Sequence, residues 1–153
     1  GVVETALAVR TGDPQMMAQD AGALRAALLA SDAIFVPDMM ASTAGIHVAK
    51  VLAQLGIADA VALRLKIYPN GATAMGELAK SNATRPIGCT QSTEIIATKG
   101  VQLSGALPKS CELATMYTAG VTTRAAHARE AQELIDLLTG DAAREARVAA
   151  GFL

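Results

Sequence analysis

Short apolar runs alternate along the chain with segments whose apolar positions recur at helical spacing. The runs predict strands, and the recurring spacing predicts helices between them. We expect strands over 5–9, 33–36, 61–67, 86–90 and 100–103, and a longer extended segment over 113–121. We expect helices over 20–30, 42–55, 72–80, 125–138 and 141–150, with a short helix beginning near 92. Repeated strand–helix units predict the α/β class, with a mostly parallel sheet flanked by helices.

Composition narrows the possible partners of this fold. The chain has 153 residues, of which 52% are apolar, so it can bury a core of ordinary size. The net charge is −1 and aromatic residues make up 3%, which argues against a nucleic-acid partner. No apolar run reaches membrane-spanning length, so we expect no direct membrane insertion. No signal peptide is visible at the start, which fits a cytoplasmic protein and equally a processed or incomplete chain.

The residues that usually carry chemistry do not cluster in this sequence. Cys89 and Cys111 lack the spacing of a disulfide framework or a zinc site, and we expect two independent buried thiols. His47 and His127 have no metal-ligand partner at helical spacing. Dinucleotide, P-loop and serine-hydrolase motifs are absent. The sequence therefore predicts neither an enzyme nor a cofactor.

The start of the helix expected over 42–55 is the most informative segment. Ser42 and Thr43 are good N-cap residues, and the small Ala44 and Gly45 would let a ligand approach the backbone. A helix N-terminus offers free N–H groups and the positive end of the helix dipole, so it favours an anion. An ordinary capped helix after a strand is the alternative.

Three turns follow three of the expected strands. If the strands are parallel, the turns at 42–45, 70–73 and 90–93 share one edge of the sheet, where ligands bind in open α/β folds. The candidate groups there are neutral: the N–H groups of 43–45, the amide of Gln91, and the hydroxyls of Ser42, Thr43, Thr73 and Thr90. Glu94 is more simply a helix cap, and Arg85 is either an anion clamp or a surface residue. Neutral groups of this kind suit binding of a small anion without chemistry.

Several of these segments together resemble the periplasmic molybdate-binding proteins of ABC transporters. The resemblance rests on residues 42–52, 55–56, 85–94, 99–101 and 151–152, and it extends over nearly the whole chain. It implies a type 2 periplasmic binding protein, in which two α/β lobes joined by two crossover strands enclose the ligand. Residues 1–123 would form the second lobe, with crossovers near 5–9 and 114–121, and residues 124–153 would be helices of the first lobe. The N-terminal part of that first lobe is absent from this sequence.

The resemblance also implies a site and partners. The family's second-lobe ligand contacts fall on the N–H groups of Ala44 and Thr73 and on Gln91, where the family usually has a tyrosine. That departure puts molybdate itself in question, and the neighbouring Thr90 hydroxyl is a substitute donor. A small oxyanion, a membrane permease and a periplasmic location are implied. We expect a partner, such as a second copy in a homo-oligomer, on the apolar surface of the C-terminal helices. The alternatives are a ligand-sensing regulatory domain of the same fold and a chain that binds nothing alone.

Overall fold

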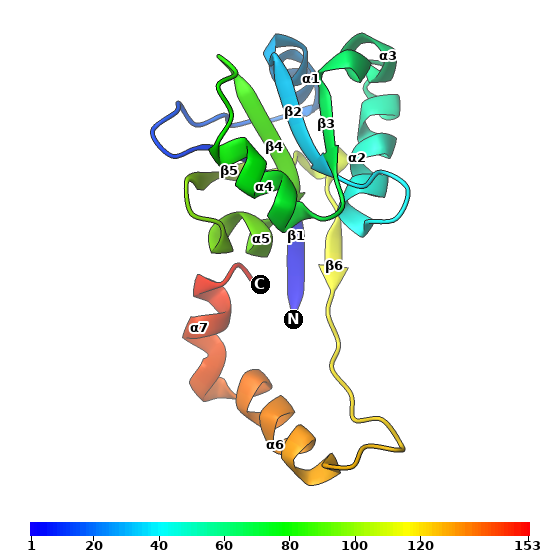
Figure 1. The fold of residues 1–153 in the computed structure, drawn as a ribbon, viewed down its shortest axis with the longest axis vertical. Helices are drawn as coiled ribbons and strands as arrows, with labels where there is room; N and C mark the ends of the chain where they lie inside the picture. Colours follow the sequence, from blue (N-terminus) through cyan, green and yellow to red (C-terminus); the bar gives the residue numbers. More distant parts are fainter.

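The computed structural model describes residues 1–153, which form an α/β body and a pair of projecting helices (Figure 1). The strands are β1 (Val2–Arg10), β2 (Ala33–Pro37), β3 (Leu65–Tyr68), β4 (Pro86–Gln91), β5 (Val101–Ala106) and β6 (Ala114–Met116). The helices are α1 (Ala21–Ala30), α2 (Thr43–Gln54), α3 (Ala58–Val61), α4 (Gly71–Ala79), α5 (Ser92–Ala97), α6 (Ala128–Thr139) and α7 (Arg144–Ala149). Short 3-10 helices lie at η1 (Ala62–Arg64), η2 (Lys109–Cys111) and η3 (Asp141–Ala143). The expected α/β class is confirmed.

The expectation of a mostly parallel sheet is wrong: the central sheet is mixed, with three antiparallel and two parallel strand pairings. Its strand order is β3-β2-β4-β1-β5, and β6 pairs with the first part of β1. β2 is parallel to both β3 and β4, whereas β1 is antiparallel to β4, β5 and β6. α1 returns the chain to the edge at which β1 ended, so β2 starts there and runs opposite to β1. The parallel part of the sheet is thus β3, β2 and β4, and their carboxyl ends meet at one edge.

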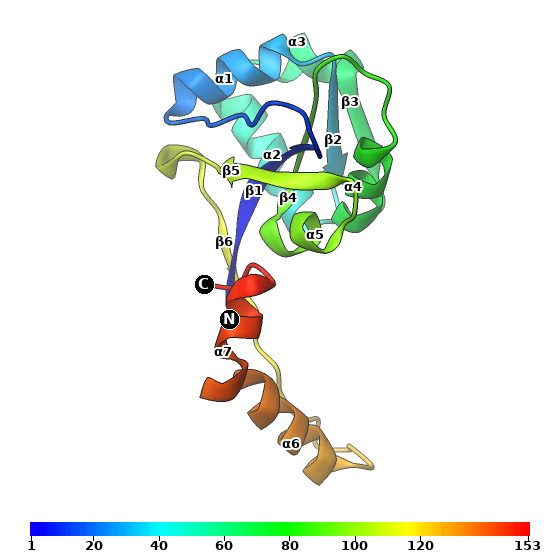
Figure 2. The ribbon, with the colours of Figure 1, turned by 90° about the vertical axis from the view of Figure 1, so that its left-hand side faces the viewer.

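Each face of this sheet is covered by its own set of helices (Figure 2). α1 and α2 contribute Leu24, Leu28, Val48 and other residues to a core cluster on one face, and α4 and α5 contribute Met75, Leu78 and Ile95 to a cluster on the other. Side chains alternate between the faces of a strand, so a strand covered on both faces is apolar throughout. β2 shows this pattern, because all five of its residues are buried.

Several element boundaries differ from the sequence-based expectation: β1 spans Val2–Arg10 instead of 5–9, and β5 ends at Ala106 instead of 103. Residues 61–64 are helical, and β3 begins only at Leu65. The Arg64 guanidinium holds that helical end by donating to the carbonyls of Leu29, Ser31 and Ala60 at 2.7–2.9 Å. The strand within the extended segment is only β6, Ala114–Met116, and α6 begins at Ala128 instead of 125. Local apolar spacing does not distinguish these ends, because distant hydrogen-bond partners decide them.

The pair α6 and α7 projects from the α/β body, and neither helix buries a single residue (Figures 1 and 2). The chain returns at its end, where Leu153 N donates to Val2 O at 2.8 Å. The expected apolar surface on these helices is present: Leu134, Leu137, Leu138 and Val148 are 54–66% exposed. The partner expected to cover that surface stays a prediction.

No single helix is long and apolar enough to cross a membrane. The pair of segments Thr43–Gln54 and Ala58–Arg64 meets the length and composition criteria together, but it is bent by 118°.

Candidate functional site

Three helices begin where the three parallel strands end. α2 follows β2, α4 follows β3, and α5 follows β4, so their N-termini lie at one edge of the sheet. A cavity of about 180 Å³ lies between them. It is lined by Ser42, Thr43, Ala44, Asn70, Gly71, Gln91, Glu94 and Tyr117. The structure thus brings together four of the seven residues proposed from sequence: Ser42, Thr43, Ala44 and Gln91.

Side-chain caps decide which backbone donors stay free at this edge. The Ser42 hydroxyl accepts from Gly45 N at 3.4 Å, and the Asn70 carbonyl oxygen accepts from Thr73 N at 2.8 Å. The N–H groups of Gly45 and Thr73 are therefore used within the protein, and neither residue lines the cavity. The N–H groups of the first two residues of each helix, Thr43 and Ala44 in α2 and Gly71 and Ala72 in α4, have no partner in the chain. Such unpaired donors at a helix start favour an anion.

Gly45 serves the protein's own packing instead of a ligand. A Cβ at this position would lie 2.1 Å from the backbone oxygen of Asp38 and 2.6 Å from that of Pro37. Only glycine lets the first turn of α2 pack this closely against the loop that follows β2. The Asp38 carboxylate holds that loop by accepting from the N–H groups of Met40 and Ala41 at 2.7 and 2.9 Å.

Gln91, at the end of β4, presents a side-chain donor to the cavity. The residue is only 7% exposed. Its carboxamide oxygen accepts a short hydrogen bond from the Tyr117 hydroxyl, which comes from the segment just after β6. Its Nε2 group has no partner in the chain, so its hydrogens are available to a ligand in the cavity. Sequence reasoning missed Tyr117, because 26 residues separate it from Gln91 and no local pattern joins the two.

Thr90 and Glu94 form a pair beside the cavity. Thr90 is fully buried, and its hydroxyl donates to the Glu94 carboxylate at 2.5 Å. The hydroxyl is therefore occupied within the protein. Glu94 makes no hydrogen bond to a backbone N–H, and α5 has no side-chain cap, so the simpler interpretation of Glu94 as a helix cap is wrong. Its carboxylate lines the cavity instead.

The other chemistry-bearing residues lie elsewhere. His47 is half-buried, and its Nε2 lies 2.8 Å from the Cys111 carbonyl oxygen, which ties α2 to η2. Cys89 and Cys111 are both free and buried, as expected. Burial raises the pKa of the Cys89 thiol to about 12, so it is a poor nucleophile. No three His, Cys, Asp or Glu side chains lie close enough together to hold a metal ion.

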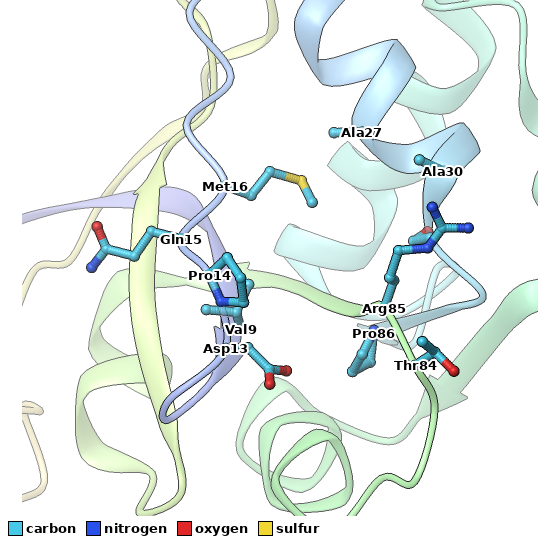
Figure 3. Close-up of a pocket in the computed structure, with 11 residues that line it drawn as sticks. Val9, Asp13, Pro14, Gln15, Met16, Ala27, Ala30, Thr84, Arg85 and Pro86 are labelled. Atoms are coloured by element: carbon cyan, nitrogen blue, oxygen red, sulfur yellow. The ribbon is translucent and has the colours of Figure 1, made fainter.

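A larger cavity, of about 260 Å³, lies at the opposite edge of the sheet (Figure 3). Pro14 and Met16 lie on one side of it, and Arg85 and Pro86 lie on the other. Asp13 is paired with Arg10 at 2.7 Å, which leaves Arg85 as the one free charge in the lining. Arg85 is exposed and belongs to this cavity, so it is remote from the helix starts. This cavity has no set of convergent donors, and the smaller one is the better candidate for an anion.

Solved structures share the fold. The substrate-binding domain of a proposed molybdenum ABC transporter from Clostridium difficile is 13% identical, with a TM-score of 0.69 over 97% of this chain. A periplasmic molybdate-binding protein from Azotobacter vinelandii is 17% identical, with a TM-score of 0.66 over 99% of this chain. The chain spans 62% and 65% of these two proteins. No curated protein sequence matches it.

The family comparison agrees with the resemblance drawn from the sequence. The family described as bacterial extracellular solute-binding protein matches residues 3–153. These residues include both helix starts, Gln91 and Tyr117 of the small cavity. The chain therefore belongs to the family of bacterial extracellular solute-binding proteins.

Proposed function

We propose that this chain carries the ligand-binding lobe of an ABC-transporter solute-binding protein, and that its ligand is a small oxyanion such as molybdate. One observation carries the proposal: three residues with unpaired N–H groups at two helix starts, Thr43, Ala44 and Gly71, line one cavity together with Gln91. Neutral donors of this kind replace the hydration shell of an anion.

The arrangement of the chain supports a division into two lobes. Residues 1–123 would form the second lobe, and residues 124–153 would belong to the first. β1 and the segment around β6 run side by side from the α/β body toward α6 and α7, as two crossovers between lobes would (Figure 1). Tyr117 lies on the second crossover, lines the cavity and donates to Gln91, so this crossover supplies a hydroxyl to the site. A periplasmic location and a membrane permease as partner follow from the same proposal.

A titration tests whether this edge of the sheet binds anions. The melting temperature of the chain is measured with molybdate, tungstate, sulfate and phosphate. A ligand that binds only the folded state stabilises it by RT ln(1 + [L]/Kd), or about 2.7 kcal/mol at a hundredfold excess over Kd. An upward shift with at least one of these anions is expected. The absence of a shift with all four would refute the proposal.

A proline substitution locates the site. Proline suits the first position of a helix, and Thr43→Pro removes one free N–H without breaking a hydrogen bond within the protein. The matched control is Ala21→Pro, at the first position of α1, which does not line the cavity. A hydrogen bond to a charged group contributes about 1.5–3 kcal/mol, so Thr43→Pro is expected to weaken anion binding roughly 10- to 100-fold. Equal affinity in both variants would place the ligand elsewhere.

A further inference from the structure

Glu94 is the only charged side chain that lines the small cavity. It projects from α5 toward the first residue of α4. A Cβ built on Gly71 would lie 2.0 Å from Glu94 Oε2 and 2.1 Å from Thr90 Oγ1, so the carboxylate lies directly against the start of α4. The absence of a side chain at Gly71 makes room for it. An acidic group therefore stands among the donors expected to bind an anion.

The two carboxylate oxygens of Glu94 have different surroundings. Oε2 accepts the Thr90 hydroxyl proton at 2.5 Å, whereas Oε1 has no partner in the chain. Glu94 is half-buried and takes part in no ion pair. A carboxylate can only accept hydrogen bonds, so its free oxygen needs a donor from the ligand or from water.

We propose that Glu94 is a specificity-determining residue, and that it makes this site select oxyanions that retain a proton over fully ionised dianions. The inference rests on the proposed anion site: it keeps a small oxyanion as the ligand, but it favours one that carries a proton over molybdate, the example named above. The backbone N–H groups and Gln91 Nε2 can donate to the oxygens of any oxyanion, so these donors do not distinguish one oxyanion from another. The carboxylate does, because an oxygen that carries hydrogen can donate to Oε1, while a bare oxygen is repelled by it.

This property divides the common tetrahedral anions into two sets. Near neutral pH, phosphate and arsenate keep at least one proton, whereas sulfate, molybdate and tungstate keep none. A site built to pair with a ligand hydroxyl rejects the analogue that lacks it, because the site's own polar group then loses that partner. We expect phosphate and arsenate to bind at least about tenfold more tightly than sulfate and molybdate of similar shape.

Isothermal titration of the wild-type chain with phosphate, arsenate, sulfate and molybdate at neutral pH measures the preference directly. The same titrations on Glu94→Gln test its cause. This variant keeps an oxygen that can accept the Thr90 hydroxyl, removes the charge, and adds a donor. It is expected to bind sulfate and molybdate at least about tenfold more tightly than the wild type, so that the ratio between the two sets falls toward one.

Glu77→Gln is the matched control. It removes the same charge from the neighbouring helix, where Glu77 pairs with Lys80 at 2.9 Å and does not line the cavity. It should leave the ratio of affinities unchanged. Equal wild-type affinity for the two sets of anions, or an unchanged ratio in Glu94→Gln, would overturn the inference while leaving the anion site in place. Failure of all four anions to bind either protein would instead refute the proposed function itself.

Discussion

The close packing of Gly45 gives the sharpest test of how the cavity is built. Ordinary van der Waals contact begins at 3.4 Å, so a Cβ at residue 45 would be about 1.3 Å too close to the Asp38 oxygen and about 0.8 Å too close to that of Pro37. Both obstacles are backbone atoms, and Asp38 is held by its bonds to two N–H groups. Neither can rotate away as a side chain could, so the first turn of α2 must move.

Overpacking of this kind typically destabilises a protein by about 1–3 kcal/mol. Alanine has a higher helix propensity than glycine, and this difference offsets roughly 0.5–1 kcal/mol of the destabilisation. We therefore expect Gly45→Ala to lower the free energy of unfolding by about 1–2 kcal/mol, measured by urea denaturation. The displaced N–H groups of Thr43 and Ala44 should also bind anions more weakly.

Gly76 provides the matched control. It lies within α4, and a Cβ built on it meets no atom within 4 Å. Gly76→Ala should therefore raise the free energy of unfolding by about 0.5–1 kcal/mol through helix propensity alone. If Gly45→Ala proved as stable as Gly76→Ala, the first turn of α2 would not be packed against Asp38, and the geometry described for the cavity would be incorrect.

Three further predictions concern other parts of the chain. Both cysteine thiols are buried, and the pKa of Cys89 is raised to about 12, so Ellman's reagent should react with neither in the native protein and with both in urea. The N–H of Arg85 is the main cause that lowers the pKa of Asp32 below its usual 3.8. The ionised carboxylate therefore stabilises the fold above pH 3.8, and this stabilisation is lost as the pH falls below that value. Asp32→Asn should lower the urea midpoint at neutral pH, and below pH 3.8 the midpoint of the variant should fall less steeply than that of the wild type. If a second copy covers α6, sedimentation of the wild-type chain should show an oligomer. The double substitution Leu134→Gln and Leu137→Gln should dissociate it, since these side chains are 54% and 66% exposed. A wild-type chain that stays monomeric at high concentration would contradict this prediction.

The sequence predicted the components of the candidate site better than their roles. Ser42, Thr43 and Ala44 were identified because cap residues and small residues mark a helix start locally. Gln91 was placed in the turn after a buried strand, and the structure makes it the last residue of that strand. Thr90 lies at the same strand end, but its hydroxyl is bonded to Glu94, which the sequence suggested was only a cap.

What the sequence by itself determined was the α/β class, the order of the elements and the family resemblance, because apolar periodicity and capping are local properties. The direction of β1 and the contact of Tyr117 with Gln91 were decided only by the tertiary structure. So was the position of the Glu94 carboxylate against Gly71. These features join residues distant in the chain, and pairing across a sheet or between helix ends leaves no periodic mark on the sequence. The sequence thus indicates where the proposed anion site lies, and in our proposal the packing of α5 against α4 sets which anions it admits.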